Sequence, residues 1–359
     1  MEASVGRICD EWAANRNFSG VCMLQVKGED VFAKAYGYAN RAFKIPNEIE
    51  TRFDTASITK IFTAAAILQL IEQGRFRFED RITEIVNLSD TQIPFDVTIE
   101  QLLNHTSGIA DDADEESGED YSALFTDSPN YVIRECKDFL KNFAYKSPNF
   151  KAGTNVRYCN CSYILLGLAI EKVTGLKYRD YIISNVFNRA EMRNSDFFAM
   201  DGVNMNTAEG YQSIMDKDGR VEGYKKNIYS YPPVGTPDGG AYTTAGDLNC
   251  FLSAIKNHRL LKEEFSNIFL RPHCAFSYPA KEYGIPGLYR TNGYAFEFLM
   301  QEGKSQPLCI CKDGQNAGVS AKFSYYPEKD ISLVLLSNQD CDVWEMTMRM
   351  QRELSLLYH

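Results

Sequence analysis

The chain has 359 residues, more than one small domain needs, and 44% of them are hydrophobic, which is enough for a large buried core. Its formal net charge of −10 and its sequence pI of about 5.1 argue against nucleic acid and anionic membrane as partners. The ten cysteines are scattered through apolar segments, which indicates reduced, buried thiols in a reducing compartment.

The N-terminal region predicts a helix followed by a β-hairpin. Residues 1–16 follow an amphipathic pattern, and two strand-like runs, 20–26 and 31–37, flank a turn at 27–30. The first residues contain no apolar h-region, and no apolar run is long enough to span a membrane. These patterns predict a cytoplasmic protein. An exported protein whose leader has been trimmed is the alternative.

The most informative stretch begins at residue 55, where a run of good helix formers continues to Gly74. At about 100° per residue, Ser57 falls near one stripe with Ile61 and Ala64, and Lys60 lies beside that stripe. A hydroxyl and an amine are thus one turn apart, near the buried face. Because a lysine in apolar surroundings has a lowered pKa, it can accept the serine proton, which makes Ser57 a candidate nucleophile.

The Ser-x-x-Lys pattern is short, and it recurs at Ser253 and Lys256. Ser253 points roughly opposite to the apolar stripe of its own predicted helix, for which Asp247 is the expected cap. We therefore interpret the second pattern as a chance occurrence that faces solvent.

An acidic segment, residues 111–120, carries seven carboxylates in ten residues. We interpret this segment as a solvated, mobile loop. A calcium-binding loop is the alternative, but Ser117 stands where an EF-hand loop requires glycine.

Two Cys-x-Cys pairs are present, Cys159/Cys161 and Cys309/Cys311. Their spacing is closer than that of the usual four-thiolate metal site. Packing as buried thiols is therefore the favoured interpretation.

The middle of the chain is predicted to be helical and its C-terminal part to be β-structure. The expected helices are 98–103, with a Thr98–Gln101 capping box, then 128–143 and 162–173, the last ended by Gly175. The expected strands are 293–300, 308–312, 319–326 and 331–337, and a helix is expected at 343–357.

Strand signals thus cluster at both ends of the chain, with helices between them. This order predicts an α+β fold, in which one antiparallel sheet is built from both chain ends and flanked by the terminal helices, with an inserted, mostly helical domain. The expected sheet domain is discontinuous and comprises 1–54 and 246–359. The expected helical domain comprises 55–245 and carries the nucleophile helix.

A serine–lysine site needs a second proton-transfer group and a group that holds the substrate. Tyr158 and Asn160, just before a predicted helix, offer these two functions. A tyrosine can shuttle a proton if a nearby cation lowers its pKa. The alternative is an ordinary aromatic residue followed by a helix-capping asparagine.

The site also needs stabilisation of developing negative charge. Lys312 ends a predicted strand and can place a cation in a cleft, while Gly314 would let a substrate approach the backbone closely. The N–H of Gln315 is a candidate oxyanion donor beside the N–H of Ser57. The alternative is a plain turn after a strand.

Six short motifs occur in a fixed order along nearly the whole chain, at residues 18–21, 52–60, 102–108, 153–160, 239–248 and 312–314. Because they occur together and in this order, the chain resembles the serine β-lactamase and penicillin-binding-protein superfamily. The resemblance is to the branch that contains class C β-lactamases, D-peptidases and related esterases, for which Ser-x-x-Lys is a signature.

The resemblance implies a role for each residue of the site. Ser57 would be the acylated nucleophile, Lys60 and Tyr158 would share general-base work, Asn160 would hold the substrate amide, and Lys312 would supply positive potential. The implied function is a serine hydrolase that forms a covalent acyl-enzyme with an ester, an amide or D-peptide, or a β-lactam. The substrate would be a small molecule or short peptide, and no metal or organic cofactor is implied. A penicillin-binding or acyl-sensing module without turnover is the alternative.

The sequence departs from the family pattern at Asp313, where threonine usually donates to a substrate carboxylate. An ionised aspartate in the cleft would repel that carboxylate and favour an ester or neutral amide. Neighbours on a strand alternate sides, so Asp313 can also point away. Cys159 stands where serine is common, and Cys311 adjoins Lys312.

Overall fold

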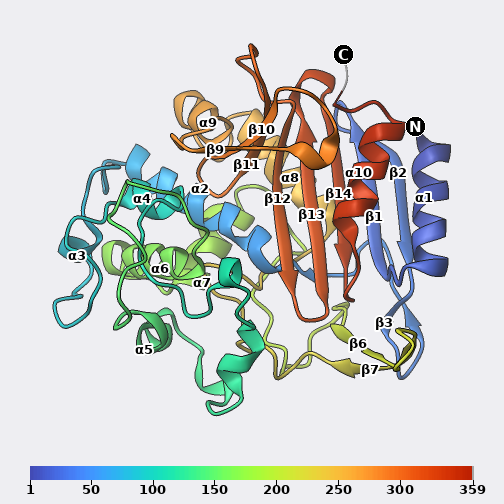
Figure 1. The fold of residues 1–359 in the computed structure, drawn as a ribbon, viewed down its shortest axis with the longest axis horizontal. Helices are drawn as coiled ribbons and strands as arrows, with labels where there is room; N and C mark the ends of the chain where they lie inside the picture. The colour runs from blue at the N-terminus through green and yellow to red at the C-terminus, as the bar shows by residue number, and fades with distance from the viewer. Residues whose placement is uncertain (358–359) are drawn as a thin grey trace.

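The computed structural model describes residues 1–357, and an eight-stranded antiparallel sheet dominates it (Figure 1). The strand order is β2-β1-β14-β13-β12-β11-β10-β9. β1 (Gly20–Val26) pairs along its whole length with β14 (Ile331–Ser337), so the two ends of the chain meet inside one sheet. This confirms the α+β fold with a sheet from both chain ends.

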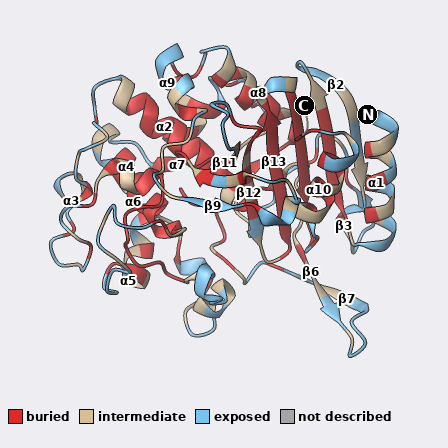
Figure 2. Cartoon of the chain, turned by 45° about the horizontal axis from the view of Figure 1, so that its top comes forward, coloured by how far each residue is buried: buried red, intermediate tan, exposed pale blue. Residues whose placement is uncertain are grey.

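The remaining strands extend this sheet or form small two-stranded ones. The large sheet also contains β2 (Glu29–Tyr36), β9 (Ser277–Pro279), β10 (Leu288–Asn292), β11 (Glu297–Gln301), β12 (Cys309–Asn316) and β13 (Val319–Tyr326). The small sheets pair β3 (Tyr38–Asn40) with β4 (Ile45–Pro46), β5 (Phe53–Asp54) with β8 (Tyr242–Thr243), and β6 (Tyr211–Met215) with β7 (Val221–Lys226). The β6–β7 hairpin projects from the body of the protein (Figure 2).

The terminal helices flank the sheet as expected. α1 (Glu2–Asn15) and α10 (Val343–Glu353) contact each other and pack on β2 and β13, and they form a core with one set of alternate strand residues. α8 (Ala245–Lys256) packs on β1 and β14 and shares a second core with the other set. Both faces of the sheet are therefore covered, which explains why β13 and β14 are buried throughout (Figure 2).

The other helices lie beside the sheet and come mostly from the middle of the chain (Figure 1). They are α2 (Lys60–Glu72), α3 (Ile82–Ile85), α4 (Ile99–Leu103), α5 (Leu140–Phe143), α6 (Asn160–Thr174), α7 (Tyr178–Ile182) and α9 (Glu263–Phe269). α2 contacts α6, α7 and α9, and every residue from Lys60 to Leu70 is buried. The expected single apolar stripe is wrong here, because a helix packed on all sides is apolar all round.

Several local predictions from the sequence are confirmed. Thr98 and Gln101 form the capping box of α4, and Gly175 ends α6 in the left-handed region at φ 74°. The expected cap at Asp247 is wrong. Thr244 caps α8, and the Asp247 carboxylate instead accepts hydrogen bonds from the Asn194 N–H and the Ser195 hydroxyl.

Two predicted elements have different forms in the structure. The expected strand 293–300 is a turn followed by β11, and the apolar turn is buried against α4, where Tyr294 donates to the carboxylate of Glu100. A buried turn and a strand thus gave the same apolar pattern. The expected helix 128–143 is two 3₁₀ turns and the short α5, because the amide of Asn130 is tied to the carbonyls of residues 228 and 231. α10 ends at Glu353 rather than at 357.

Among the described residues, no helix combines the length and the apolar character that crossing a bilayer requires.

Candidate active site

Ser57 lies on a tight turn between β5 and α2. Ala56 has φ 43°, a strained value for a residue with a Cβ, and its N–H donates to the Asp54 carboxylate at 2.7 Å. A 3₁₀ helix, Ala56–Thr59, follows and leads directly into α2. With three residues per turn, a 3₁₀ helix places side chains i and i+3 in line, so Ser57 and Lys60 face the same way.

Lys60 is fully buried, and its ammonium group makes three hydrogen bonds. Its Nζ donates to Ser57 Oγ at 3.1 Å, to Asn160 Oδ1 at 2.7 Å and to the Asp238 carbonyl at 2.6 Å. Burial, aided by the Lys312 charge and opposed by the Asp238 carboxylate, lowers the pKa of Lys60 to about 8. The three contacts hold the amine against the serine hydroxyl.

Tyr158 reaches Ser57 from the other side, and its hydroxyl donates to Ser57 Oγ at 2.8 Å. The ammonium groups of Lys60 and Lys312 each lie 5.0 Å from the centre of its ring. Burial nevertheless raises the pKa of Tyr158 well above its usual value. The two nearby cations therefore do not outweigh burial, and the role of Tyr158 as a proton shuttle stays a prediction.

Asn160 is the first residue of α6 and links Lys60 to the acidic segment. Its Oδ1 accepts from Lys60, while its Nδ2 donates to Glu115 Oε1 at 2.8 Å. The backbone N–H groups of Asn160 and Cys161 donate to the Asp111 carboxylate at 2.8 and 2.9 Å. Asp111 thus caps the N-terminus of α6 and fixes the position of Asn160.

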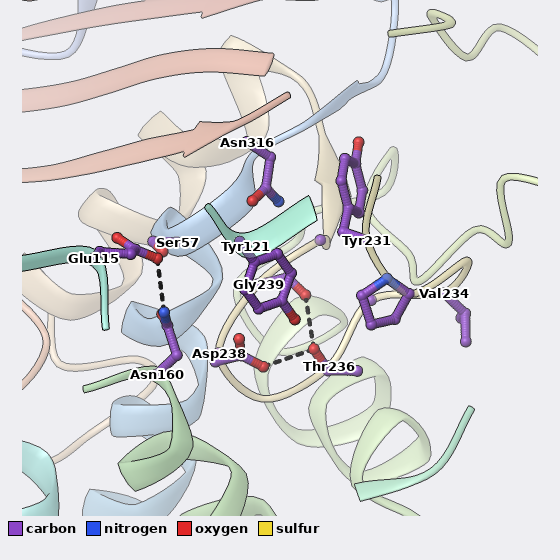
Figure 3. Close-up of a pocket in the computed structure, with 13 residues that line it drawn as sticks. Ser57, Glu115, Tyr121, Asn160, Tyr231, Val234, Thr236, Asp238, Gly239 and Asn316 are labelled. Carbon is purple, nitrogen blue, oxygen red and sulfur yellow. Dashed lines mark hydrogen bonds between the residues drawn. The ribbon is translucent and has the colours of Figure 1, made fainter. Parts of the chain in front are cut away.

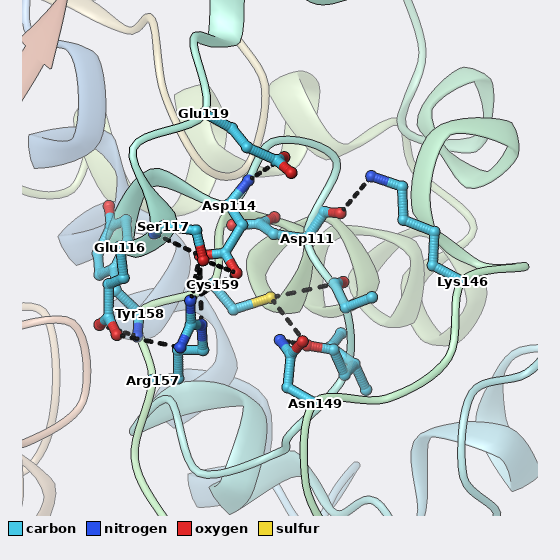
Figure 4. Close-up of polar contacts among 12 residues, drawn as sticks. Asp111, Asp114, Glu116, Ser117, Glu119, Lys146, Asn149, Arg157, Tyr158 and Cys159 are labelled. Atoms are coloured by element: carbon cyan, nitrogen blue, oxygen red, sulfur yellow. Dashed lines mark hydrogen bonds and ion pairs between the residues drawn. The ribbon is translucent and has the colours of Figure 1, made fainter.

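The acidic segment 111–120 is packed against the site (Figure 4). Asp111 and Asp112 are buried. Arg157 donates to both oxygens of Asp114, at 2.7 and 2.5 Å, and the Tyr158 N–H donates to Glu116 at 2.9 Å. The interpretation of this segment as a solvated loop holds for residues 115–120, which are exposed, but is wrong for Asp111 and Asp112, which are buried. Several of its carboxylates accept hydrogen bonds from the residues that carry Tyr158 and Asn160.

Replacing Arg157 by glutamine should loosen this attachment. We expect kcat/KM for an acyl ester to fall about tenfold, which corresponds to ~1.4 kcal/mol, with the thermal midpoint little changed. The matched control is Arg77→Gln, which breaks the exposed Arg77–Asp80 pair away from the site. Equal rates in the two variants would show that the Arg157–Asp114 pair does not position Tyr158.

Lys312 and Asp313 on β12 point to opposite faces of the sheet. Lys312 is buried, lies over the Tyr158 ring, and its Nζ is 3.4 Å from Glu297. Asp313 accepts hydrogen bonds from Lys322 and, at 2.6 Å, from Trp344 on α10. Although burial opposes it, the charge of Lys322 lowers the pKa of Asp313. Asp313 therefore does not face the cleft.

Gly314 is close to the chain that carries the nucleophile. A Cβ at this position would lie 2.1 Å from the Thr55 carbonyl oxygen, so only glycine lets β12 approach the turn. Its expected role in admitting substrate stays a prediction. The side chain of Gln315 is exposed, and the oxyanion role of its N–H also stays a prediction.

A pocket adjoins Ser57 (Figure 3). Its lining comprises Ser57, Glu115, Tyr121, Asn160, Tyr231, Pro232, Val234, Gly235, Thr236, Asp238, Gly239, Gly240 and Asn316. The analysis of the sequence missed Glu115, Tyr121, Tyr231 and Asn316 as site residues. The acidic segment was a signal for Glu115, but nothing in the pattern distinguishes the other three. The loop at 234–240 is part of a Gly- and Pro-rich run, 232–240, that overlaps the start of the fifth motif.

His105 is buried between the rings of Tyr158 and Tyr163, at 4.7 and 5.4 Å between centroids. Its Nδ1 accepts from the Cys159 N–H at 3.2 Å. Burial, with the Lys312 and Lys60 charges, holds the pKa of His105 well below its usual value. A neutral imidazole here supports Tyr158 from behind.

The second Ser-x-x-Lys pattern makes no comparable site. Ser253 accepts from the side chain of Asn257, whereas Lys256 pairs with Asp330. The ten cysteine thiols are all free, and Cys159 is buried, as expected of packed thiols.

Comparison with known proteins found matches along most of the chain. The family model for Beta-lactamase matches residues 7–355. Penicillin-binding protein 4* of Bacillus subtilis is 26% identical over 339 residues, which cover 90% of this chain and 69% of that protein. The crystal structure of a penicillin binding protein from Bacillus halodurans has a TM-score of 0.87 at 34% identity, covering 97% of this chain and 99% of that one. D-amino acid amidase from Ochrobactrum anthropi shares the fold, with a TM-score of 0.77 at 21% identity over 98% of each chain.

Proposed function

Because this chain belongs to the Beta-lactamase family, we propose that it is a serine hydrolase in which Ser57 forms a covalent acyl-enzyme with an ester, amide or β-lactam. The family match confirms the resemblance that the six motifs indicated. The observation that carries the proposal is the double contact of Ser57 Oγ, 3.1 Å from Lys60 Nζ and 2.8 Å from the Tyr158 hydroxyl.

Lys60 is the better general base of the two. Its pKa of about 8 lets it lose a proton near neutral pH, whereas burial raises the pKa of Tyr158. Neutral Lys60 accepts the Ser57 proton as Oγ bonds to the substrate carbonyl carbon and the carbonyl oxygen becomes an oxyanion. The leaving group then departs with a proton relayed through the Tyr158 hydroxyl. In the second step water adds to the ester carbonyl of Ser57 as neutral Lys60 takes one of its protons. Ser57 Oγ then leaves with that proton, which releases the acid and restores the free serine.

Asn160 and Lys312 serve the substrate rather than the proton transfer. The Nδ2 of Asn160 can donate a hydrogen bond to a substrate carbonyl when it releases its hydrogen bond to Glu115. Lys312 provides positive potential beside Tyr158, where negative charge develops. Since Asp313 points away from the cleft, it does not exclude substrates that carry a carboxylate.

Rapid mixing with p-nitrophenyl acetate tests the proposal. We expect a burst of one nitrophenolate per chain, followed by steady turnover, and one acetyl group on Ser57 in the intact and peptide masses. Neutral hydroxylamine removes acetyl from thioesters faster than from a serine ester, so it separates cysteine adducts. A burst without turnover would indicate an acyl-sensing module. Turnover with no acyl group on Ser57 at any time would contradict the proposal.

A further inference from the structure

Glu115 places a carboxylate in the pocket of the nucleophile (Figure 3). Its Oε1 accepts from Asn160 Nδ2 at 2.8 Å, and Asn160 Oδ1 accepts from Lys60 at 2.7 Å. Lys60 in turn donates to Ser57 Oγ. The carboxylate is therefore connected to the reacting hydroxyl through two side chains, and both Glu115 and Ser57 line the same cavity.

The residues beside Glu115 hold it in this position. It begins a 3₁₀ turn, Glu115–Ser117, whose cap Asp114 accepts from the Ser117 N–H at 3.2 Å and from Arg157. Glu116 accepts from the Tyr158 N–H outside the pocket. The flanking carboxylates thus bind Arg157 and the Tyr158 N–H, while the Glu115 carboxylate, among the described residues, accepts only from Asn160 and lines the cavity.

The lining of the pocket suits a cation. Its second carboxylate, Asp238, accepts from Thr236 at 2.7 Å. In the part of the chain that the structure describes, no lysine, arginine or histidine lines this pocket. Lys60 uses its three protons on other acceptors, and Lys312 is paired with Glu297. Pro232 and Val234 add an apolar wall. An ammonium group next to an aliphatic side chain matches this lining, whereas a carboxylate does not.

We propose that Glu115 binds a protonated amino group on the acyl part of the substrate. The preferred substrates are then amides or esters of amino acids, or of peptides with a free amino terminus, rather than N-acylated compounds. This rests on the proposed function, because the amine is placed beside the carbonyl that Ser57 attacks. An α-amino group is one carbon atom from that carbonyl, and Glu115, whose carboxylate is released when Asn160 Nδ2 turns to the carbonyl, lines the same cavity as Ser57.

Competition against a neutral reporter ester tests this inference. Hydrolysis of p-nitrophenyl acetate is followed at pH 7, where an α-amino group of pKa ~7.7–8.0 is mostly protonated. The inhibitors are leucinamide, as each enantiomer, and 4-methylpentanamide, which lacks only the amino group. In the wild type we expect the better enantiomer of leucinamide to bind about 10- to 100-fold more tightly than 4-methylpentanamide, the range for a charge-assisted contact.

The variant Glu115→Gln should remove this preference, so that the ratio of the inhibition constants of 4-methylpentanamide and leucinamide, measured on the same preparation, falls to about one. The matched control is Glu119→Gln, which neutralises an exposed carboxylate of the same segment outside the pocket and should keep the preference. Equal inhibition by the two amides in the wild type, or an unchanged preference in Glu115→Gln, would overturn the inference. Neither result affects the dependence of ester turnover on Ser57, which tests the proposed function separately.

Discussion

Replacing Ser57 by alanine should reduce kcat/KM for p-nitrophenyl acetate by at least about 10³-fold, because the variant lacks the oxygen that forms the acyl-enzyme. The remaining rate would come from the protein's thiols and from water. The measurement is steady-state release of nitrophenolate in matched preparations, with the thermal midpoint recorded for each. Removing one small hydroxyl should leave that midpoint almost unchanged.

The chain contains its own control for this experiment. Ser253→Ala alters the second Ser-x-x-Lys pattern, whose serine and lysine point to different partners, and it should retain the wild-type rate. If Ser57→Ala and the wild type turn over equally, Ser57 is not the nucleophile. If Ser253→Ala loses activity, the interpretation of the second pattern is wrong.

Lys60→Met should lower kcat/KM by about 10²- to 10⁴-fold, the usual contribution of a general base. Methionine fills much of the same buried space but cannot accept the proton of Ser57. It also leaves two buried acceptors, Asn160 Oδ1 and the Asp238 carbonyl, without their donor. Circular dichroism establishes that the variant is folded, and Lys256→Met is the matched control. Activity above about a tenth of wild type would assign the base to another group.

The pH profile of the wild type gives the same test without a mutation. Since Lys60 has a pKa of about 8, kcat/KM should rise about tenfold per unit below that pH and level off above it. The folded pKa is below the usual 10.5, so the unfolded chain binds more protons between pH 8 and 10.5. The contribution of Lys60 to the free energy of unfolding therefore rises with pH through this window. A rate that is flat through pH 8 would contradict Lys60 as the base.

Much of the architecture could be predicted because it depends on periodic patterns and caps. The strands at 20–26, 319–326 and 331–337 and the capping box at Thr98 are local features that the structure keeps. The turn at 293–296 was mistaken for a strand, because a loop buried against another segment is as apolar as a strand. Burial of that turn depends on tertiary contacts that no local pattern contains.

Part of the site could also be predicted, because local motifs contain four of its residues. Ser57, Lys60, Tyr158 and Asn160 meet within hydrogen-bonding distance, as their motifs indicated. The motifs did not indicate the 3₁₀ turn that brings Ser57 and Lys60 into line, because helix type depends on the strain at Ala56.

Residues that loops bring to the pocket were harder to foresee. Tyr231 lines it from a loop, whose residues follow no period, and Asn316 lines it from the last position of β12, without any sequence signal. Glu115 was missed because its carboxylate-rich segment has the composition of a solvated loop, and its hydrogen bond from Asn160 depends on a tertiary contact.

The pairing of β1 with β14 has a consequence for how the protein is made. The hairpin of β1 and β2 is synthesised long before β14, and its inner edge has no partner until residues 331–337 are made. Throughout most of translation this edge offers unsatisfied backbone groups and an apolar surface, the features that promote aggregation of nascent chains. The sheet therefore closes through contacts of very high sequence separation, between residues 20–26 and 331–337, and contacts of this kind slow folding.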